Sequence, residues 1–183
     1  MSAPVILAAT LAPALASTSA DMATLDRFEA LLAAHDSATE ALGKWCAAER
    51  LAAVPDIRVR RIAGADAAPP AGLARLLGVG PRTKIGYRHV ALMCGERVLS
   101  EAHNWYVRAR LTPAMNRALD TSDIPFGRVA APLAFRREAL DRQRGLCPAG
   151  AISTHRALLR LADRQPLALV VECYTAANLA AGG

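Results

Sequence analysis

The chain has 183 residues, the length of a single domain, and its 53% hydrophobic and 21% charged residues exclude an intrinsically disordered protein. No apolar run reaches the roughly 18 residues that a membrane-spanning helix needs. The net charge of +6 comes almost entirely from arginine, since Lys44 and Lys84 are the only lysines, and this favours an acidic partner. Nucleic acid is not favoured, because only 4% of residues are aromatic and no basic block is interleaved with stacking residues.

The first twenty residues carry no charge. Their apolar part, Val5 to Ala16, is similar to a secretory signal, and small residues at 14–16 could be a cleavage site, although the usual Lys or Arg near the start is missing. A disordered Ala/Pro-rich leader is the alternative. The chain is therefore expected to be cytoplasmic if the leader is no signal, and periplasmic or secreted if residues 1–20 are cleaved. The folded domain is predicted to span residues 21–183.

Four cysteines show neither CxxC spacing nor histidines at metal-ligand intervals, so no metal site and no cofactor are predicted. Buried free thiols are the default expectation. If the chain is exported, one or two disulfides are the alternative, and the sequence cannot identify the pairs. The four are Cys46, Cys94, Cys147 and Cys173.

The first half of the chain begins with helical spacing. Residues 21–54 repeat apolar side chains at helical intervals, and Asp21 and Ser37 are good N-cap residues, so two helices are predicted. Residues 56–62 (DIRVRRI) alternate apolar residues with arginine, which predicts a strand with one solvated face. Residues 73–81 (LARLLGVGP) predict a short helical turn.

Beyond that turn the hydrophobic period changes to two. Residues 83–94 and 97–111 predict two strands that flank Gly95-Glu96, a strong hairpin signal. Residues 112–120 predict a short helix capped by Thr112 with proline in its first turn. The remaining predicted elements are a turn and short helix at 123–133, a short strand at 134–140, and a second hairpin formed by 151–162 and 166–176.

These elements define the fold class. Five or six strands are predicted, and neighbouring strands joined by tight turns should be antiparallel. The chain shows no regular alternation of strands and helices, which argues against a doubly wound parallel sheet. The predicted fold is α+β, a single domain with N-terminal helices packed on an antiparallel sheet.

Two charged residues stand out within the predicted strands. Arg88 lies in the middle of a long strand, and Glu172 is the only charge in an apolar strand. Burying either alone would cost several kcal/mol, so each is expected to pair with the other or with a ligand. A purely structural ion pair, or a Glu172 that faces water, is the alternative. His89, His103 and His155 are expected to be ordinary sheet residues.

Several common active-site motifs are absent, among them GxSxG, GxxxxGK[ST], HExxH and a strand-linked GxGxxG. A basic cluster follows the predicted short helix at 123–133. It is expected to form a solvated rim that could steer an anion. The cluster consists of Arg136, Arg137, Arg142 and Arg144.

Residues 31–175 resemble the chorismate–pyruvate lyase family, whose fold is shared with the ligand-binding domain of GntR-type regulators. The segments that carry the resemblance occur in family order: DSATEAL, YRHVALMCGERVLSEA, IPFGRV, FRREAL and ALVVECYTA. The resemblance implies that Arg88 binds a substrate carboxylate with bidentate geometry. It also implies that backbone N–H groups near Phe126 and Gly127 hold a carboxylate, and that Glu172 hydrogen-bonds the ring hydroxyl as the acid/base group.

The implied reaction eliminates pyruvate from chorismate to give 4-hydroxybenzoate, a step of ubiquinone biosynthesis, and needs no metal or cofactor. Two departures from the family concern the pocket. Ala38 replaces a larger apolar residue, and Glu101, His103 and Asn104 could form a more polar wall.

A non-catalytic protein of the same fold, which binds a small aromatic acid and is exported, is the second hypothesis. It has no DNA-binding helix-turn-helix, because only two helices precede Asp56. A purely structural or partner-binding domain is the third hypothesis. Under the first two hypotheses the partner is a small anionic molecule, without nucleic acid or membrane, and the chain is expected to be a monomer.

Overall fold

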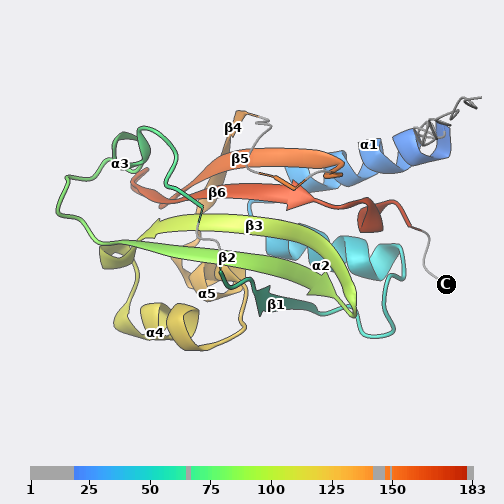
Figure 1. Cartoon of the computed structure of the whole chain (residues 1–183), viewed down its shortest axis with the longest axis horizontal. Helices are drawn as coiled ribbons and strands as arrows, with labels where there is room; N and C mark the ends of the chain where they lie inside the picture. Colours follow the sequence, from blue (N-terminus) through green and yellow to red (C-terminus); the bar gives the residue numbers. More distant parts are fainter. Residues whose placement is uncertain (1–18, 65–66, 142–146, 149, 181–183) are drawn as a thin grey trace, which may run out of the picture.

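Six β-strands form one antiparallel sheet in the order β1-β2-β3-β6-β5-β4 (Figure 1). The computed structural model describes residues 19–64, 67–141, 147–148 and 150–180. The predicted α+β class and strand number are confirmed. The strands are β1 (Ile57–Arg61), β2 (Ile85–Cys94), β3 (Arg97–Val107), β4 (Arg136–Asp141), β5 (Ser153–Arg160) and β6 (Pro166–Tyr174).

The two predicted N-terminal helices are confirmed as α1 (Ser19–Ala33) and α2 (Ala38–Ala48). Ser37 caps α2, because its Oγ accepts a hydrogen bond from the Glu40 N–H at 3.3 Å. The predicted N-cap at Asp21 is wrong, since α1 begins two residues earlier. Asp21 lies instead in the first turn, where a negative charge is favourable. Residues 1–18 of the predicted leader lie outside the described residues.

The later helices are short. The predicted cap of α4 is confirmed, because the Thr112 Oγ1 accepts a hydrogen bond from the Met115 N–H at 3.1 Å. The β2–β3 hairpin turns at Gly95, whose φ of 56° lies in the left-handed region that glycine adopts readily. The short helices are α3 (Leu73–Leu76), α4 (Pro113–Thr121) and α5 (Phe126–Ala130), and single 3₁₀ turns cover Arg108–Arg110, Ala131–Leu133 and Ala176–Asn178.

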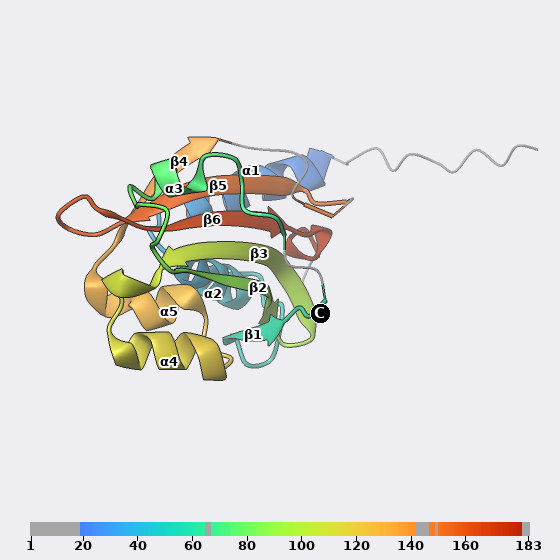
Figure 2. The same ribbon diagram turned by 60° about the vertical axis from the view of Figure 1, so that its left-hand side comes forward.

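Each face of the sheet has its own covering layer. Helices α1, α2, α4 and α5 lie on one side, and α3 with its flanking loops lies on the other (Figures 1 and 2). On the first side Phe28 and Trp45 pack against Tyr174 and Val90. Alternate residues of the same strands point to the opposite side, where Trp105 packs with α3.

Two disulfides connect elements that are distant in sequence. Cys46–Cys94 joins α2 to β2, and Cys147–Cys173 joins the segment before β5 to β6. All four cysteines are therefore paired, and the default expectation of free thiols is wrong.

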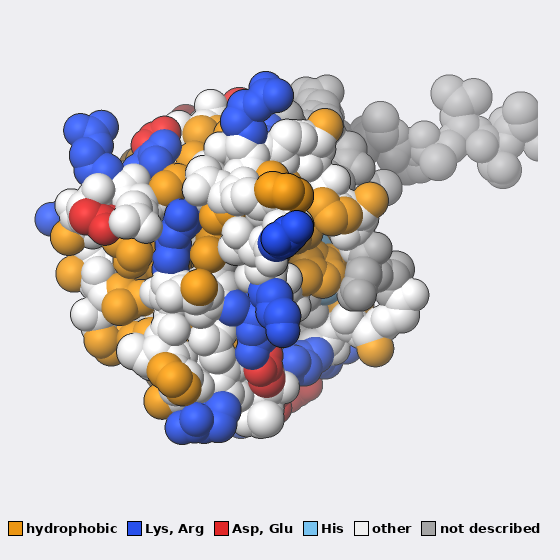
Figure 3. Space-filling model, turned by 90° about the vertical axis from the view of Figure 1, so that its left-hand side faces the viewer, with side chains coloured by type: hydrophobic (Ala, Val, Ile, Leu, Met, Phe, Trp, Pro, Cys, Tyr) orange, Lys and Arg blue, Asp and Glu red, His pale blue; other side chains and the backbone are white. Residues whose placement is uncertain are grey.

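The surface at one end of the molecule carries dispersed charge. Figure 3 shows the end of the molecule with α3 and α4, where Lys and Arg side chains lie in several separate groups with acidic and hydrophobic side chains between them. Among the described helices, none has both the length and the apolar character required to cross a bilayer.

Candidate functional site

A small cavity lies between the sheet and the N-terminal ends of α2 and α5. Its wall is largely apolar, and polar side chains enter it from Asn104 on β3 and from the Arg137–Glu172 pair. The enclosed volume is about 30 Å³. This volume accommodates a water molecule but no aromatic ring. The apolar part of the wall comes from Ala38, Val90, Leu92, Ala102, Phe126, Phe135, Leu159 and Val170.

A larger hollow of about 510 Å³ opens beside this cavity on the surface. Ser37, Thr39, Gly127 and Phe135 belong to the walls of both, so the hollow is the approach to the cavity. Ligand pockets commonly measure roughly 300–1,000 Å³, so the hollow has the size of a small-molecule site whereas the cavity has room for a single group of such a molecule.

Glu172 is 5% exposed and its carboxylate is bound by Arg137 of β4. The Arg137 Nη2 donates to Oε2 at 2.5 Å and Nη1 donates to Oε1 at 3.3 Å. The Tyr174 hydroxyl also donates to Oε2 at 3.0 Å. Burial by itself would lower the pKa of Arg137, but the adjacent Glu172 carboxylate raises it overall. Burial, followed by the Glu172 charge, raises the pKa of Tyr174 well above its usual value.

This ion pair corrects one prediction and resolves another. Arg137 does not belong to a solvated rim, because only 11% of its side chain is exposed. Arg136 does match that prediction, since its side chain is 83% exposed. Arg142 and Arg144 lie outside the described residues. The expectation that Glu172 pairs with Arg88 is wrong, because its charged partner is Arg137, as in the alternative of a structural ion pair.

Arg88 is 4% exposed and binds backbone carbonyls directly after the C-terminal end of α4. Its Nη1 donates to the Ile124 carbonyl at 3.1 Å and its Nη2 donates to the Ser122 carbonyl at 3.3 Å. Arg61 donates to the Leu119 carbonyl in the same region at 2.6 Å. Burial, together with the Arg61 charge, lowers the pKa of Arg88. Arg88 and Glu172 lie on strands separated by β3, and a carboxylate bound to Arg88 would replace these two carbonyls.

Gly127 lies where α2 and α5 approach most closely. A Cβ atom at this position would be 2.5 Å from the Ser37 Oγ and 3.1 Å from the Thr39 Oγ1, so the approach requires glycine. In the first turn of α5 the N–H groups of Arg128 and Val129 donate to the Pro125 carbonyl. The first N–H groups of any helix have no partner within it, and the binding of a carboxylate near Phe126 and Gly127 remains a prediction.

Replacing Gly127 with alanine is expected to destabilise the protein by about 1 kcal/mol, the usual contribution of an N-cap. The new Cβ atom must displace the Ser37 Oγ, which caps α2. Urea unfolding of Gly127→Ala measures the effect. The matched control is Gly80→Ala, since a Cβ atom at Gly80 meets nothing within 4 Å. Equal stability of both variants would contradict a tight contact between α2 and α5.

Asp36 is a site residue that the sequence analysis missed. Its carboxylate accepts hydrogen bonds from the Arg137 backbone N–H at 2.8 Å and from the Arg136 Nη1 at 2.9 Å, which ties the α1–α2 connection to β4. Burial would raise the pKa of Asp36, but these two hydrogen bonds and the charges of both arginines lower it overall. In the sequence Asp36 is marked only by its position before the N-cap residue Ser37, which does not indicate a site residue.

The two predicted departures from the family have different outcomes. Ala38 lines the cavity, as does Asn104. Glu101 and His103 do not, because they alternate with Asn104 along β3 and therefore point to the opposite face of the sheet. The prediction that these two residues form a pocket wall is wrong.

The rim of the hollow carries both signs of charge in matched pairs. Lys44 Nζ lies 2.9 Å from the Glu40 carboxylate, and Arg128 Nη2 lies 2.9 Å from the Asp56 carboxylate. All four residues line the hollow and their side chains are about half exposed. Pairs of this kind contribute little to stability, so they can separate to meet a charged ligand.

This sheet order and cavity define the class of fold. The effector domain of PhnF from Mycobacterium smegmatis has a TM-score of 0.54 at 14% identity, over 76% of this chain and 88% of that chain. The PhnF structure from the same organism has a TM-score of 0.55 at 16% identity, over 77% of this chain and 64% of that chain. The domain therefore has the fold of these two structures, and the predicted chorismate lyase-like fold is confirmed.

No family model matches the chain. A curated relative does: uncharacterized protein y4mC of Sinorhizobium fredii (strain NBRC 101917 / NGR234) is 39% identical over 176 residues, which cover 84% of this chain and 74% of that protein. The chain belongs to the same family as y4mC.

Proposed function

We propose that this domain binds a small cyclic carboxylic acid in the hollow between α2 and α5. The observation that carries the proposal is the continuity of a ligand-sized hollow with a buried, mostly apolar cavity. Such an arrangement of an apolar wall with a few fixed polar groups is typical of small-molecule sites. Small-molecule binding also agrees with the fold, since the neighbours of this fold include effector domains.

The electrostatics of the hollow support an anionic ligand. The N-terminal ends of α2 and α5 both border it, and helix N-termini attract negative charge through their unpaired N–H groups. The Lys44 and Arg128 side chains are close enough to turn from their present partners toward a carboxylate. The ring of the ligand would pack on Phe135, with one substituent directed through the entrance toward Asn104.

Elimination of pyruvate from chorismate is the second candidate function. One observation favours it: Glu172, the acid/base group implied by the resemblance, lies in the wall of the cavity. Both of its carboxylate oxygens already accept hydrogen bonds, from Arg137 and Tyr174, so a ring hydroxyl would have to displace one of these donors. For this reason we place binding before catalysis.

The disulfides support an exported protein. Disulfides persist in oxidising compartments and are rare in the cytosol, and this domain has two. Chorismate is a cytoplasmic metabolite, so an exported domain would meet a different aromatic or cyclic acid. Localisation of the full chain in cell fractions tests this part of the proposal.

Replacing Asn104 with leucine is expected to weaken binding of 4-hydroxybenzoate at least tenfold, because a fixed polar group in an apolar wall orients the ligand. Calorimetric titration of the wild type and the variant measures the loss. The control is Thr154→Val on β5, which faces the other side of the sheet. Equal affinities of wild type and Asn104→Leu would remove the cavity from the proposal.

The same samples distinguish binding from turnover. Incubation with chorismate, followed by chromatography for 4-hydroxybenzoate and pyruvate, detects the lyase. Product that disappears in Glu172→Gln would establish catalysis by this residue. A rise in melting temperature without product would establish binding alone, and neither signal with either compound would contradict both candidates.

A further inference from the structure

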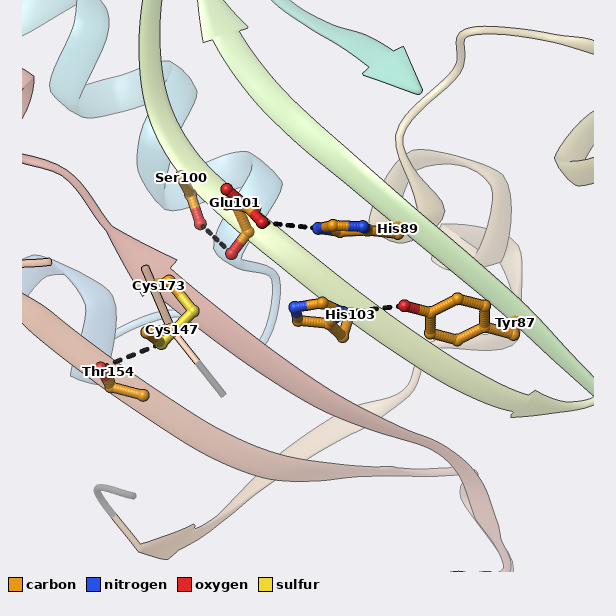
Figure 4. The surroundings of a disulfide bond; sticks show 8 residues. All are labelled: Tyr87, His89, Ser100, Glu101, His103, Cys147, Thr154 and Cys173. Carbon is orange, nitrogen blue, oxygen red and sulfur yellow. Dashed lines mark hydrogen bonds and ion pairs between the residues drawn. A yellow bond between two sulfur atoms is a disulfide. The ribbon is translucent and has the colours of Figure 1, made fainter. Parts of the chain in front are cut away.

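Two histidines and a glutamate meet on the face of the sheet opposite the cavity. His89 of β2 and His103 of β3 are direct partners in the antiparallel register, and Glu101 precedes His103 by two positions, so all three side chains point the same way. Figure 4 shows the Glu101 carboxylate directed at the His89 ring, with the His103 ring beside it.

The potential ligand atoms converge. The His89 Nε2 lies 2.6 Å from the Glu101 Oε1, and the two imidazole rings are stacked with centroids 4.2 Å apart. One ligand atom from each of the three residues falls within 4.8 Å of the others. Bonds of about 2.1 Å to a tetrahedral ion place its ligands about 3.4 Å apart, so the ligand atoms would move by about 1 Å and the two rings would turn out of their stacked arrangement on binding.

The surroundings of His103 are compatible with a metal-binding tautomer. Its Nδ1 lies 2.9 Å from the Tyr87 hydroxyl oxygen, which also accepts a hydrogen bond from the Ala67 N–H at 3.0 Å. When the Nδ1–H donates to this oxygen, the lone pair of His103 resides on Nε2. Metal-binding histidines are commonly oriented in this way by a second hydrogen bond.

The two ring nitrogens of His89 have different surroundings. Its Nδ1 is buried and has no hydrogen-bond partner among the described residues, while its Nε2 contacts Glu101. Buried polar atoms without partners are uncommon in native proteins, so a water molecule is expected beside Nδ1, whereas Nε2 is the nitrogen that faces the cluster. The Glu101 side chain is 24% exposed, which leaves the cluster open to solvent on one side.

We propose that His89, Glu101 and His103 bind one divalent transition-metal ion of the zinc type. Imidazole nitrogen and carboxylate oxygen are ligands that suit Zn²⁺, and three protein ligands leave one coordination position for water. No metal site was predicted here, because the ligands come from two strands and only the register brings them together. The proposal is independent of the ligand cavity, which lies across the sheet.

The test uses the full chain without a histidine tag, first stripped with a chelator. Calorimetric titration with ZnCl₂ is expected to show one ion per chain, and Zn²⁺ but not Mg²⁺ is expected to raise the melting temperature. Glu101→Gln and His89→Gln are each expected to weaken Zn²⁺ binding at least tenfold. The matched control is His35→Gln, since His35 also lies beside a glutamate, at 3.9 Å from Glu40, but outside the cluster.

A second readout identifies the ligands directly. Substitution of Co²⁺ is expected to give visible absorption bands of a four-coordinate nitrogen and oxygen site, which Glu101→Gln removes. His103 is buried, so the partly exposed Glu101 is the first position to vary, and the melting temperature of its metal-free form checks folding. Absence of Zn²⁺ binding by the wild type, or binding that only His35→Gln removes, would overturn the proposal.

Discussion

Reduction of the disulfides is expected to lower the free energy of unfolding by about 7.5 kcal/mol in total. The cysteines of the Cys46–Cys94 bond are 48 positions apart and those of the Cys147–Cys173 bond are 26 apart. In the chain-entropy description, loops of these lengths correspond to about 4 and about 3.5 kcal/mol. The free energy of unfolding of a small domain is only about 5–15 kcal/mol in all, so the reduced chain should be largely unfolded. Urea unfolding with and without a reductant measures the difference.

Paired substitutions separate the two bonds. Cys46→Ala with Cys94→Ala should cost slightly more than Cys147→Ala with Cys173→Ala, because the first bond closes the longer loop. Comparison of each paired variant with the wild type also shows whether that bond forms in the purified protein. A reduced chain that unfolds at the same urea concentration as the oxidised chain would show that the disulfides do not stabilise the fold.

Replacing Arg137 with leucine is expected to destabilise the protein by about 3–5 kcal/mol, the cost of leaving one member of a buried ion pair without its partner. Only 7% of the Glu172 side chain and 11% of the Arg137 side chain are exposed, so water cannot replace the lost contacts. Urea unfolding at neutral pH gives the loss as a shift in midpoint at constant slope.

Two further variants identify the cause. Arg137→Leu combined with Glu172→Leu removes both charges, and most of the stability should return because no isolated charge is then buried. Arg136→Leu is the surface control, since the Arg136–Asp36 pair is largely exposed and should contribute no more than about 1 kcal/mol. If the single and double variants were equally unstable, the loss would come from packing and not from an unpaired charge.

The local elements of this fold could be predicted from sequence because their signals are local. The β2–β3 hairpin follows from period-two spacing around Gly95, and the start of α2 follows from Ser37. The pairing of β3 with β6 was not predicted, because the two strands are about sixty residues apart and each also reads as half of a local hairpin. Disulfide partners escaped prediction for the same reason.

The candidate site was predicted in part. Glu172, Phe126, Gly127 and Ala38 were all selected from sequence, and all line the cavity. Arg137 was missed because a short strand with several charged residues resembles a solvated edge, and only the register of β4 directs this one side chain inward. The roles assigned to Arg88 and Glu172 in substrate binding remain predictions.

The strand order also determines which strands lie at the two free edges of the sheet. β1 and β4 have one neighbour each, so both present backbone groups that could pair with another chain. Arg58 and Arg60 are exposed on β1, and Arg136 and Glu138 are exposed on β4. Two β1 strands brought together would place arginine near arginine, which opposes pairing, and the Val59 N–H already donates to the Asp123 carbonyl. The arginines of β1 therefore protect the domain against aggregation through this edge of its sheet.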